Sequence, residues 1–169
     1  MFSNYTDILE FKIFEQKFKK IIYENYPFLK DYQINCYTPE QYFQLKNVPI
    51  LVFADNDVFG FSSNDKIRNS EGKFFAAIIV SPQMCKILDF SSENILGAIA
   101  HEIGHMVNLY NPLVQNAHIS WKEIYADKFV KEIGLSSNLT TLLRKLKNSN
   151  FYSSEQNLLF EKRIEELIK

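Results

Sequence analysis

The sequence has few of the features that mark secreted, membrane-spanning or nucleic-acid-binding proteins. Only two of its 169 residues are cysteines, Cys36 and Cys85, whereas a small secreted domain usually carries several disulfide-forming pairs. We interpret both as reduced thiols that fill a core. No apolar run approaches the roughly 20 residues needed to cross a bilayer. The segment Met1–Asp7 lacks the basic start and apolar centre of a signal peptide.

The charge is also small. The formal net charge is −1, and the two signs are interspersed along the chain, so there is no electrostatic case for binding nucleic acid or an anionic membrane. These absences together predict a soluble, cytoplasmic protein with no nucleic-acid or membrane partner. They do not indicate an oligomeric state.

The length and the composition predict one globular domain of the α+β class. Hydrophobic residues make up 46% of the chain, which is enough for a sizeable core. We expect a single domain over residues 1–169 in two lobes. The first, 1–110, should hold an N-terminal helix, a small mixed sheet and a long apolar helix, and the second, 111–169, should be all helical.

Local patterns place the elements. Asp7 can cap a first helix that ends before Pro27. Strands are predicted at 32–38, 48–53, 58–61 and 74–80, a helical turn at Pro39 and an exposed loop at 62–73. Later helices should begin at Ser91 or Ser92, Ser120, Ser136 or Ser137, and Ser153, with the first of these ending near Tyr110 and Gly134 closing the second.

The strand at 74–80 has two interpretations. Its free edge could pair with an extended peptide at the rim of a binding site, because strand addition supplies main-chain hydrogen bonds without demanding particular side chains. Alternatively, it is an ordinary interior strand.

The most informative stretch is His101-Glu102-Ile103-Gly104-His105 inside the long apolar helix. Residues four apart lie on one face of a helix, so His101 and His105 could hold one zinc ion between their ring nitrogens. Glu102 is rotated by about 100° from His101, which suits a general base acting on a water rather than a third ligand. The chain has three histidines, so a chance match is improbable; two core histidines are the competing interpretation.

A third zinc ligand is needed, since catalytic zinc usually takes three protein ligands. The candidates are His118, Glu123, Asp127 and the cysteines, and we favour Glu123 in the first turn of the next helix. Asp127, one turn later, could accept the outer N–H of a ligating histidine. Against this, Ser120-x-x-Glu123 is itself a capping-box pattern, in which Glu123 would bind the backbone of Ser120.

With these residues in view, the chain resembles the gluzincin metallopeptidases, in particular the HtpX-like and CAAX-prenyl-protease-like group. The resemblance rests on His101-Glu102-x-x-His105, on Glu123-x-x-Ala126-Asp127, on the strand at 74–80 and on a late Arg163-Ile164. It implies a zincin-like fold with zinc between the lobes. It also implies zinc ligands His101, His105 and Glu123, with Glu102 as general base.

The chain departs from that group in lacking transmembrane helices, which favours a minimal soluble form. No residue is identified firmly as the donor to a reaction oxyanion. His118, Tyr110, Tyr125 and Arg163 are candidates, although we expect His118 and Arg163 to lie in solvent and Tyr125 in the core.

The function that follows is a zinc-dependent endopeptidase acting on protein or peptide substrates. One alternative is an ImmA/IrrE-like regulatory protease, which would share the histidine motif and the later glutamate. Another is a non-catalytic domain that binds zinc and a partner.

Overall fold

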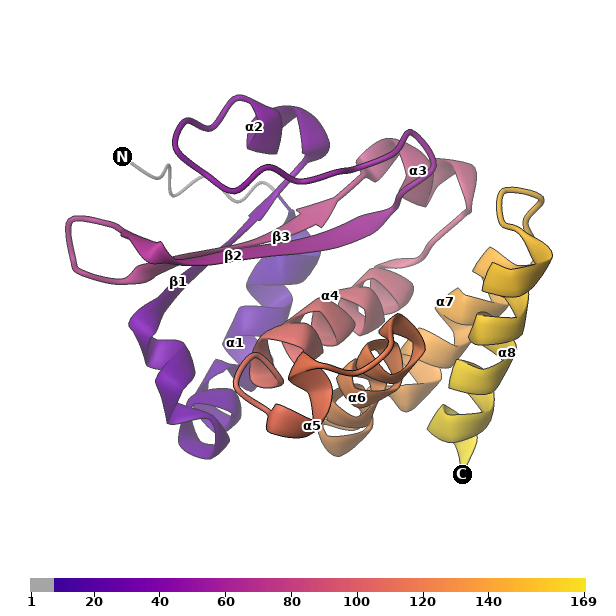
Figure 1. The fold of residues 1–169 in the computed structure, drawn as a ribbon. Helices are drawn as coiled ribbons and strands as arrows, with labels where there is room; N and C mark the ends of the chain where they lie inside the picture. The colour runs from indigo at the N-terminus through magenta and orange to yellow at the C-terminus, as the bar shows by residue number, and fades with distance from the viewer. Residues whose placement is uncertain (1–7) are drawn as a thin grey trace. The chain divides into compact units, whose positions relative to one another are not determined.

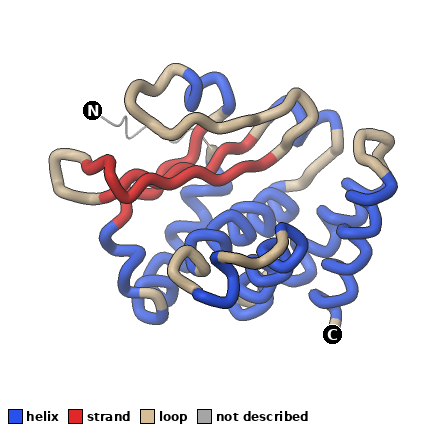
Figure 2. Tube along the Cα trace, in the orientation of Figure 1, coloured by secondary structure: helices blue, strands red, loops and turns tan. Residues whose placement is uncertain are grey.

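The computed structural model describes residues 8–169 as an α+β protein with a small mixed sheet (Figures 1 and 2). The expected cap at Asp7 and the segment Met1–Asp7 lie outside the described residues. The chain forms two compact units, one up to Met84 and one from Cys85 to Lys169. In chain order the elements are α1 (Leu9–Asn25), η1 (Pro27–Asp31), β1 (Tyr32–Tyr37), α2 (Pro39–Phe43), β2 (Phe59–Arg68), β3 (Phe74–Val80), α3 (Pro82–Ile87), α4 (Ser92–Val107), α5 (Pro112–Gln115), α6 (Ile119–Glu132), α7 (Ser136–Asn148) and α8 (Ser154–Ile168).

The first unit is built on a three-stranded sheet in the order β1-β3-β2 (Figure 1). β1 runs parallel to β3, and β2 runs antiparallel to it. β3 is therefore the central strand, and residues Phe75 to Val80 are buried on both of its faces. This explains its unbroken apolar sequence, since a strand covered on both faces needs no polar alternation. The interior interpretation of 74–80 is confirmed, and pairing of β3 with a peptide is wrong because both its edges are occupied.

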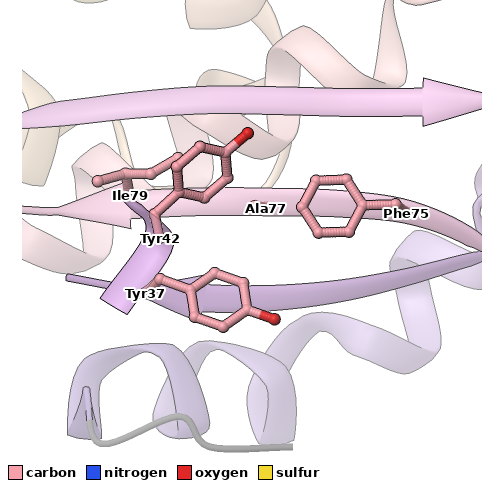
Figure 3. Close-up of a cluster of buried hydrophobic side chains, with 5 residues drawn as sticks. All are labelled: Tyr37, Tyr42, Phe75, Ala77 and Ile79. Carbon is pink, nitrogen blue, oxygen red and sulfur yellow. The ribbon is translucent and has the colours of Figure 1, made fainter. Parts of the chain in front are cut away.

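One face of the sheet carries a buried aromatic cluster, drawn in Figure 3, in which Tyr42 of α2 packs over side chains of β1 and β3. The Tyr42 hydroxyl donates to the carbonyl oxygen of Pro49 at 2.7 Å and lies 2.9 Å from Ser62 Oγ. α2 itself begins with a capping box between Thr38 and Gln41, so the predicted turn at Pro39 is a short helix. The members of the cluster are Tyr37, Tyr42, Phe75, Ala77 and Ile79.

Two local predictions are wrong. Residues 48–53 form an irregular segment, in which Ile50 is 99% and Val52 90% exposed. Pro49 has no N–H to donate to a ladder, and Val48, Leu51 and Phe53 pack on the aromatic cluster instead. Conversely, most of the expected loop at 62–73 belongs to β2. Its polar residues suit an edge strand, where one side chain in two faces solvent.

The second unit consists of helices, as expected. α4 starts at a capping box in which Ser91 Oγ accepts from Asn94 N at 3.3 Å, and it ends at Val107, three residues before the predicted position. α8 starts at a similar box between Ser153 and Gln156. Gly134 follows α6 with a φ of +80°, the left-handed conformation of a helix C-cap. Within residues 8–169, no helix is both long enough and apolar enough to cross a membrane.

Two glycines of α4 allow other helices to approach its backbone. A Cβ atom on Gly104 would lie 2.5 Å from the carbonyl oxygen of Ala126 in α6, and one on Gly97 would lie 2.7 Å from the backbone nitrogen of Leu139 in α7. α4 therefore belongs with the helices that follow it, and the units divide at Met84/Cys85 rather than at the expected residue 110. Close helix packing accounts for Gly104.

We expect Gly104→Ala to lower the free energy of unfolding by about 1–3 kcal/mol, because the added methyl group overpacks the α4–α6 contact. If the added methyl group met no neighbour, replacing a helical glycine by alanine would instead raise the free energy of unfolding by about 1 kcal/mol. Urea unfolding midpoints measure the difference. Glu165→Ala, at an exposed position of α8, is the control and should leave the midpoint unchanged. A rise in stability of the Gly104 variant would contradict the packing argument.

Candidate metal centre

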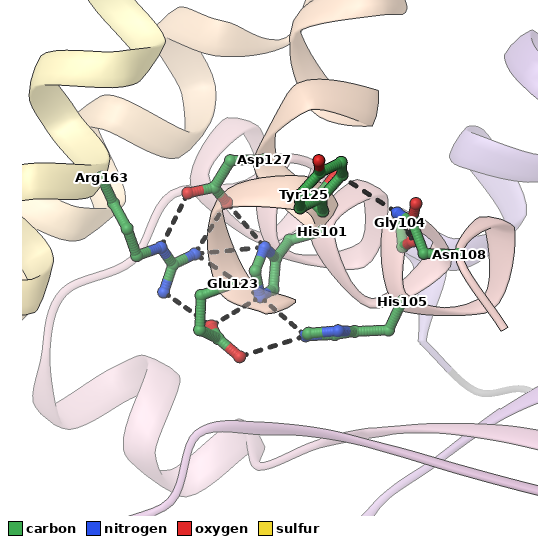
Figure 4. Close-up of polar contacts among 8 residues, drawn as sticks. All are labelled: His101, Gly104, His105, Asn108, Glu123, Tyr125, Asp127 and Arg163. Atoms are coloured by element: carbon green, nitrogen blue, oxygen red, sulfur yellow. Dashed lines mark hydrogen bonds and ion pairs between the residues drawn. The ribbon is translucent and has the colours of Figure 1, made fainter. Parts of the chain in front are cut away.

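Three nitrogen- and oxygen-bearing side chains of the second unit converge on one point (Figure 4). The Nε2 atoms of His101 and His105 are 3.1 Å apart. From the first turns of α6, Glu123 places Oε2 3.1 Å from His101 Nε2 and Oε1 3.3 Å from His105 Nε2. The sequence prediction that these three residues come together is thus met by the geometry.

The spacing of these atoms suits a small cation. Zinc bonds of about 2.0–2.1 Å at tetrahedral angles place neighbouring ligand atoms about 3.3 Å apart. The measured separations of 3.1 to 3.3 Å match this value. Imidazole nitrogen and carboxylate oxygen are also donors that zinc accepts. The donor set therefore fits the ion that the sequence implies.

Glu123 does not form the capping box with Ser120 that the sequence also allows. α6 begins with His118 as its N-cap, and the backbone N–H of Ser120 donates to His118 Nδ1 at 3.3 Å. With the cap supplied by another residue, the Glu123 carboxylate is left to face the two imidazoles. His118 is exposed at the helix start, as expected, and is not one of the converging side chains.

Asp127 lies one turn along α6 from Glu123. It contacts His101 at Nδ1, whereas Glu123 lies near Nε2 of the same ring. Its Oδ1 is 2.7 Å from His101 Nδ1, so the imidazole can donate its Nδ1–H there and keep Nε2 for a ligand. Asp127 is only 2% exposed, so it is not a charge on the protein surface. The sequence spacing from Glu123 placed this residue correctly.

Arg163 of α8 does not lie where the sequence predicts. It is 6% exposed rather than in solvent, and its Nε and NH2 atoms donate to the two oxygens of Asp127 at 2.8 and 2.9 Å. Its NH1 lies 3.0 Å from Glu123 Oε2. These donors already bind carboxylates, so Arg163 is not placed to donate to an oxyanion. The late position of Arg163 and its residue type were the only sequence signal.

The charges of this group determine its protonation in the metal-free protein. Burial and the nearby Arg163 disfavour a proton on His101, but Glu123 and Asp127 more than offset them and raise its pKa to about 9. Burial also opposes ionisation of Glu123, yet His101, His105 and Arg163 together lower its pKa well below the usual value. When no metal is bound, the positive charges of His101 and Arg163 thus compensate the negative charges of Glu123 and Asp127.

Glu102 interacts with the charges of this network but not through a hydrogen bond that the structure shows. It is buried beside His101 on α4, and burial raises the pKa of its carboxyl group. Among residues 8–169, its carboxylate accepts no hydrogen bond, in contrast to those of Glu123 and Asp127. Glu102 is the residue that the sequence predicts as the general base, and this role stays a prediction.

The remaining oxyanion candidates have other surroundings. Tyr110 is exposed beyond the end of α4. Tyr125 is partly buried rather than in the core, and the ammonium of Lys128 lies 4.2 Å from its ring centre. The backbone oxygen of Tyr125 accepts from Asn108 Nδ2 at 3.3 Å, which joins the end of α4 to α6 (Figure 4).

Comparisons of the chain with protein-family models, curated proteins and solved structures found no match. The resemblance to gluzincins accordingly rests on the sequence features given above alone.

We expect wild-type protein to bind one equivalent of zinc. His105→Ala and Glu123→Ala each remove a donor, so affinity should fall by more than the roughly 10–100-fold typical of changes around a ligand. Metal analysis after dialysis measures the bound zinc. His118→Asn, which changes the third histidine but keeps a residue type that caps helices, is the matched control and should keep its metal. Retention of zinc by the Glu123 variant would exclude that residue as a ligand.

The metal-free protein should lose stability as the pH rises from 6.5 to above 9. The pKa of His101 is raised in the folded state, so its contribution is complete below the unfolded value near 6.5 and is lost as pH passes about 9. Urea unfolding in the presence of a chelator measures this slope. His101→Gln should flatten it, and an equal slope in both proteins would contradict the assignment.

Proposed function

We propose that the chain is a zinc-dependent endopeptidase of the gluzincin type. The observation that carries the proposal is the convergence of His101, His105 and Glu123 from two packed helices, with a buried glutamate next to the first histidine. A zinc ion held there would act as a Lewis acid and lower the pKa of a water to about 7. Extended protein or peptide segments are the expected substrates, and a cytoplasmic location stays a prediction.

Asp127 and Glu102 have different roles in the proposed reaction. Asp127 holds the Nδ1–H of His101 and so orients its ring. Glu102 accepts a proton from the attacking water and passes it to the amine of the departing peptide, which closes the proton balance of hydrolysis.

We expect Glu102→Gln to keep its zinc and to lose hydrolysis of an unfolded casein-like substrate by about 10²–10⁴-fold, the range of general acid–base catalysis. Zinc content and the rate of peptide release, each with and without a chelator, are the measurements. Glu93→Gln, an exposed glutamate in the first turn of the same helix, is the matched control and should cleave normally.

Full activity in the Glu102 variant would show that another group takes the proton. A zinc-loaded wild-type protein that cuts no substrate would favour a zinc-binding interaction domain over a peptidase.

A further inference from the structure

An arginine of the last helix occupies the centre of the buried charge network. Arginine is rarely buried unless it is paired, and here three of its nitrogens have carboxylate partners from one helix, α6. In Figure 4 the guanidinium of Arg163 lies between the carboxylates of Asp127 and Glu123, with His101 beside it. α8 thereby reaches into a group of residues otherwise supplied by α4 and α6.

We propose that Arg163 is a positioning residue of the metal centre, which holds Glu123 and Asp127 in the orientation that faces the two histidines before a cation binds. The inference rests on the proposed metal centre. It goes further by making zinc affinity depend on a residue that no zinc ion would touch.

Charge alone gives the opposite expectation. A cation beside a metal site repels the incoming ion, so an arginine that acted only through its charge would weaken zinc binding. What a guanidinium offers instead is a planar, rigid set of donors that fixes two carboxylates at once. Arg163 holds Oε2 of Glu123, and Oε1 remains 3.3 Å from His105 Nε2. A carboxylate ordered in advance loses less conformational freedom when it binds a metal.

Attachment of α8 to the neighbouring helices does not by itself explain why Arg163 is buried. α8 already buries Phe160 and Leu167 in the second unit, which supplies the apolar contact that attaches a helix to its neighbours. A buried ion pair is weak evidence for stability, since replacing it by apolar residues is often neutral. The burial of Arg163 is better explained by its contacts with Glu123 and Asp127, which hold these two carboxylates in place.

The test is Arg163→Lys, which keeps the positive charge and removes the planar fork. We expect zinc affinity, measured by competition with a chromophoric chelator, to fall about 10–100-fold, and the visible absorption spectrum of the Co²⁺-loaded protein to change because the third ligand is displaced. Arg144→Lys, at an exposed position of α7, is the matched control and should reproduce the wild-type affinity and spectrum.

A second variant, Arg163→Gln, separates positioning from charge. Loss of the repelling cation alone would raise zinc affinity, whereas loss of positioning lowers it. Unfolding of each metal-free variant checks the fold. If both variants lose cooperative unfolding, Arg163 is a structural residue and the inference is wrong.

The remaining outcomes separate the two proposals. Wild-type affinity and spectrum in the folded Arg163→Lys protein overturn the inference and leave the proposed function standing. A wild type that binds no zinc overturns both. A wild type that binds zinc but cleaves nothing, with reduced affinity in Arg163→Lys, overturns the peptidase alone and supports the inference.

Discussion

The contact between the backbones of α4 and α6 at Gly104 and Ala126 is the constraint on which the centre depends. It sets the two helices so close that a single methyl group would not fit between them. Ala126 lies between Glu123 and Asp127 in the sequence, and Gly104 lies between the two histidines. The same close approach therefore brings both carboxylates to the imidazoles. Side chains as short as aspartate can contact across a helix pair only at such a separation.

Around this contact the second unit buries charged groups that would be costly alone. His101, Asp127 and Arg163 are all nearly inaccessible to water, and an unpaired charge in that environment is strongly unfavourable. Each is satisfied by another member of the group, so the network tolerates burial as a set. The low local dielectric then strengthens the same interactions. This explains how a small helical unit can hold several ionised groups in fixed orientations.

Much of the local structure followed from sequence pattern, and the failures have a common cause. The caps at Ser91 and Ser153 and the strand Phe74–Val80 were predicted because the signal and its physical cause lie in the same few residues. The segment 48–53 has strand-forming residues yet packs as irregular chain, and the polar residues after Phe61 form an edge strand. In both cases contacts outside the segment decided the conformation, with the aromatic cluster for 48–53 and with β3 for β2, so propensity was overridden by packing and pairing.

The sequence by itself determined that two imidazoles share one helix face, since a spacing of four residues allows no other arrangement on a helix. It also indicated Glu123 and Asp127 as the partners, with a capping box between Ser120 and Glu123 as the less favoured alternative. The tertiary structure decided between them by bringing the imidazoles of α4 to the carboxylate of Glu123, while His118 caps α6. It alone also placed Arg163 inside the network, because nothing in the local pattern of α8 records which helix its buried face will meet.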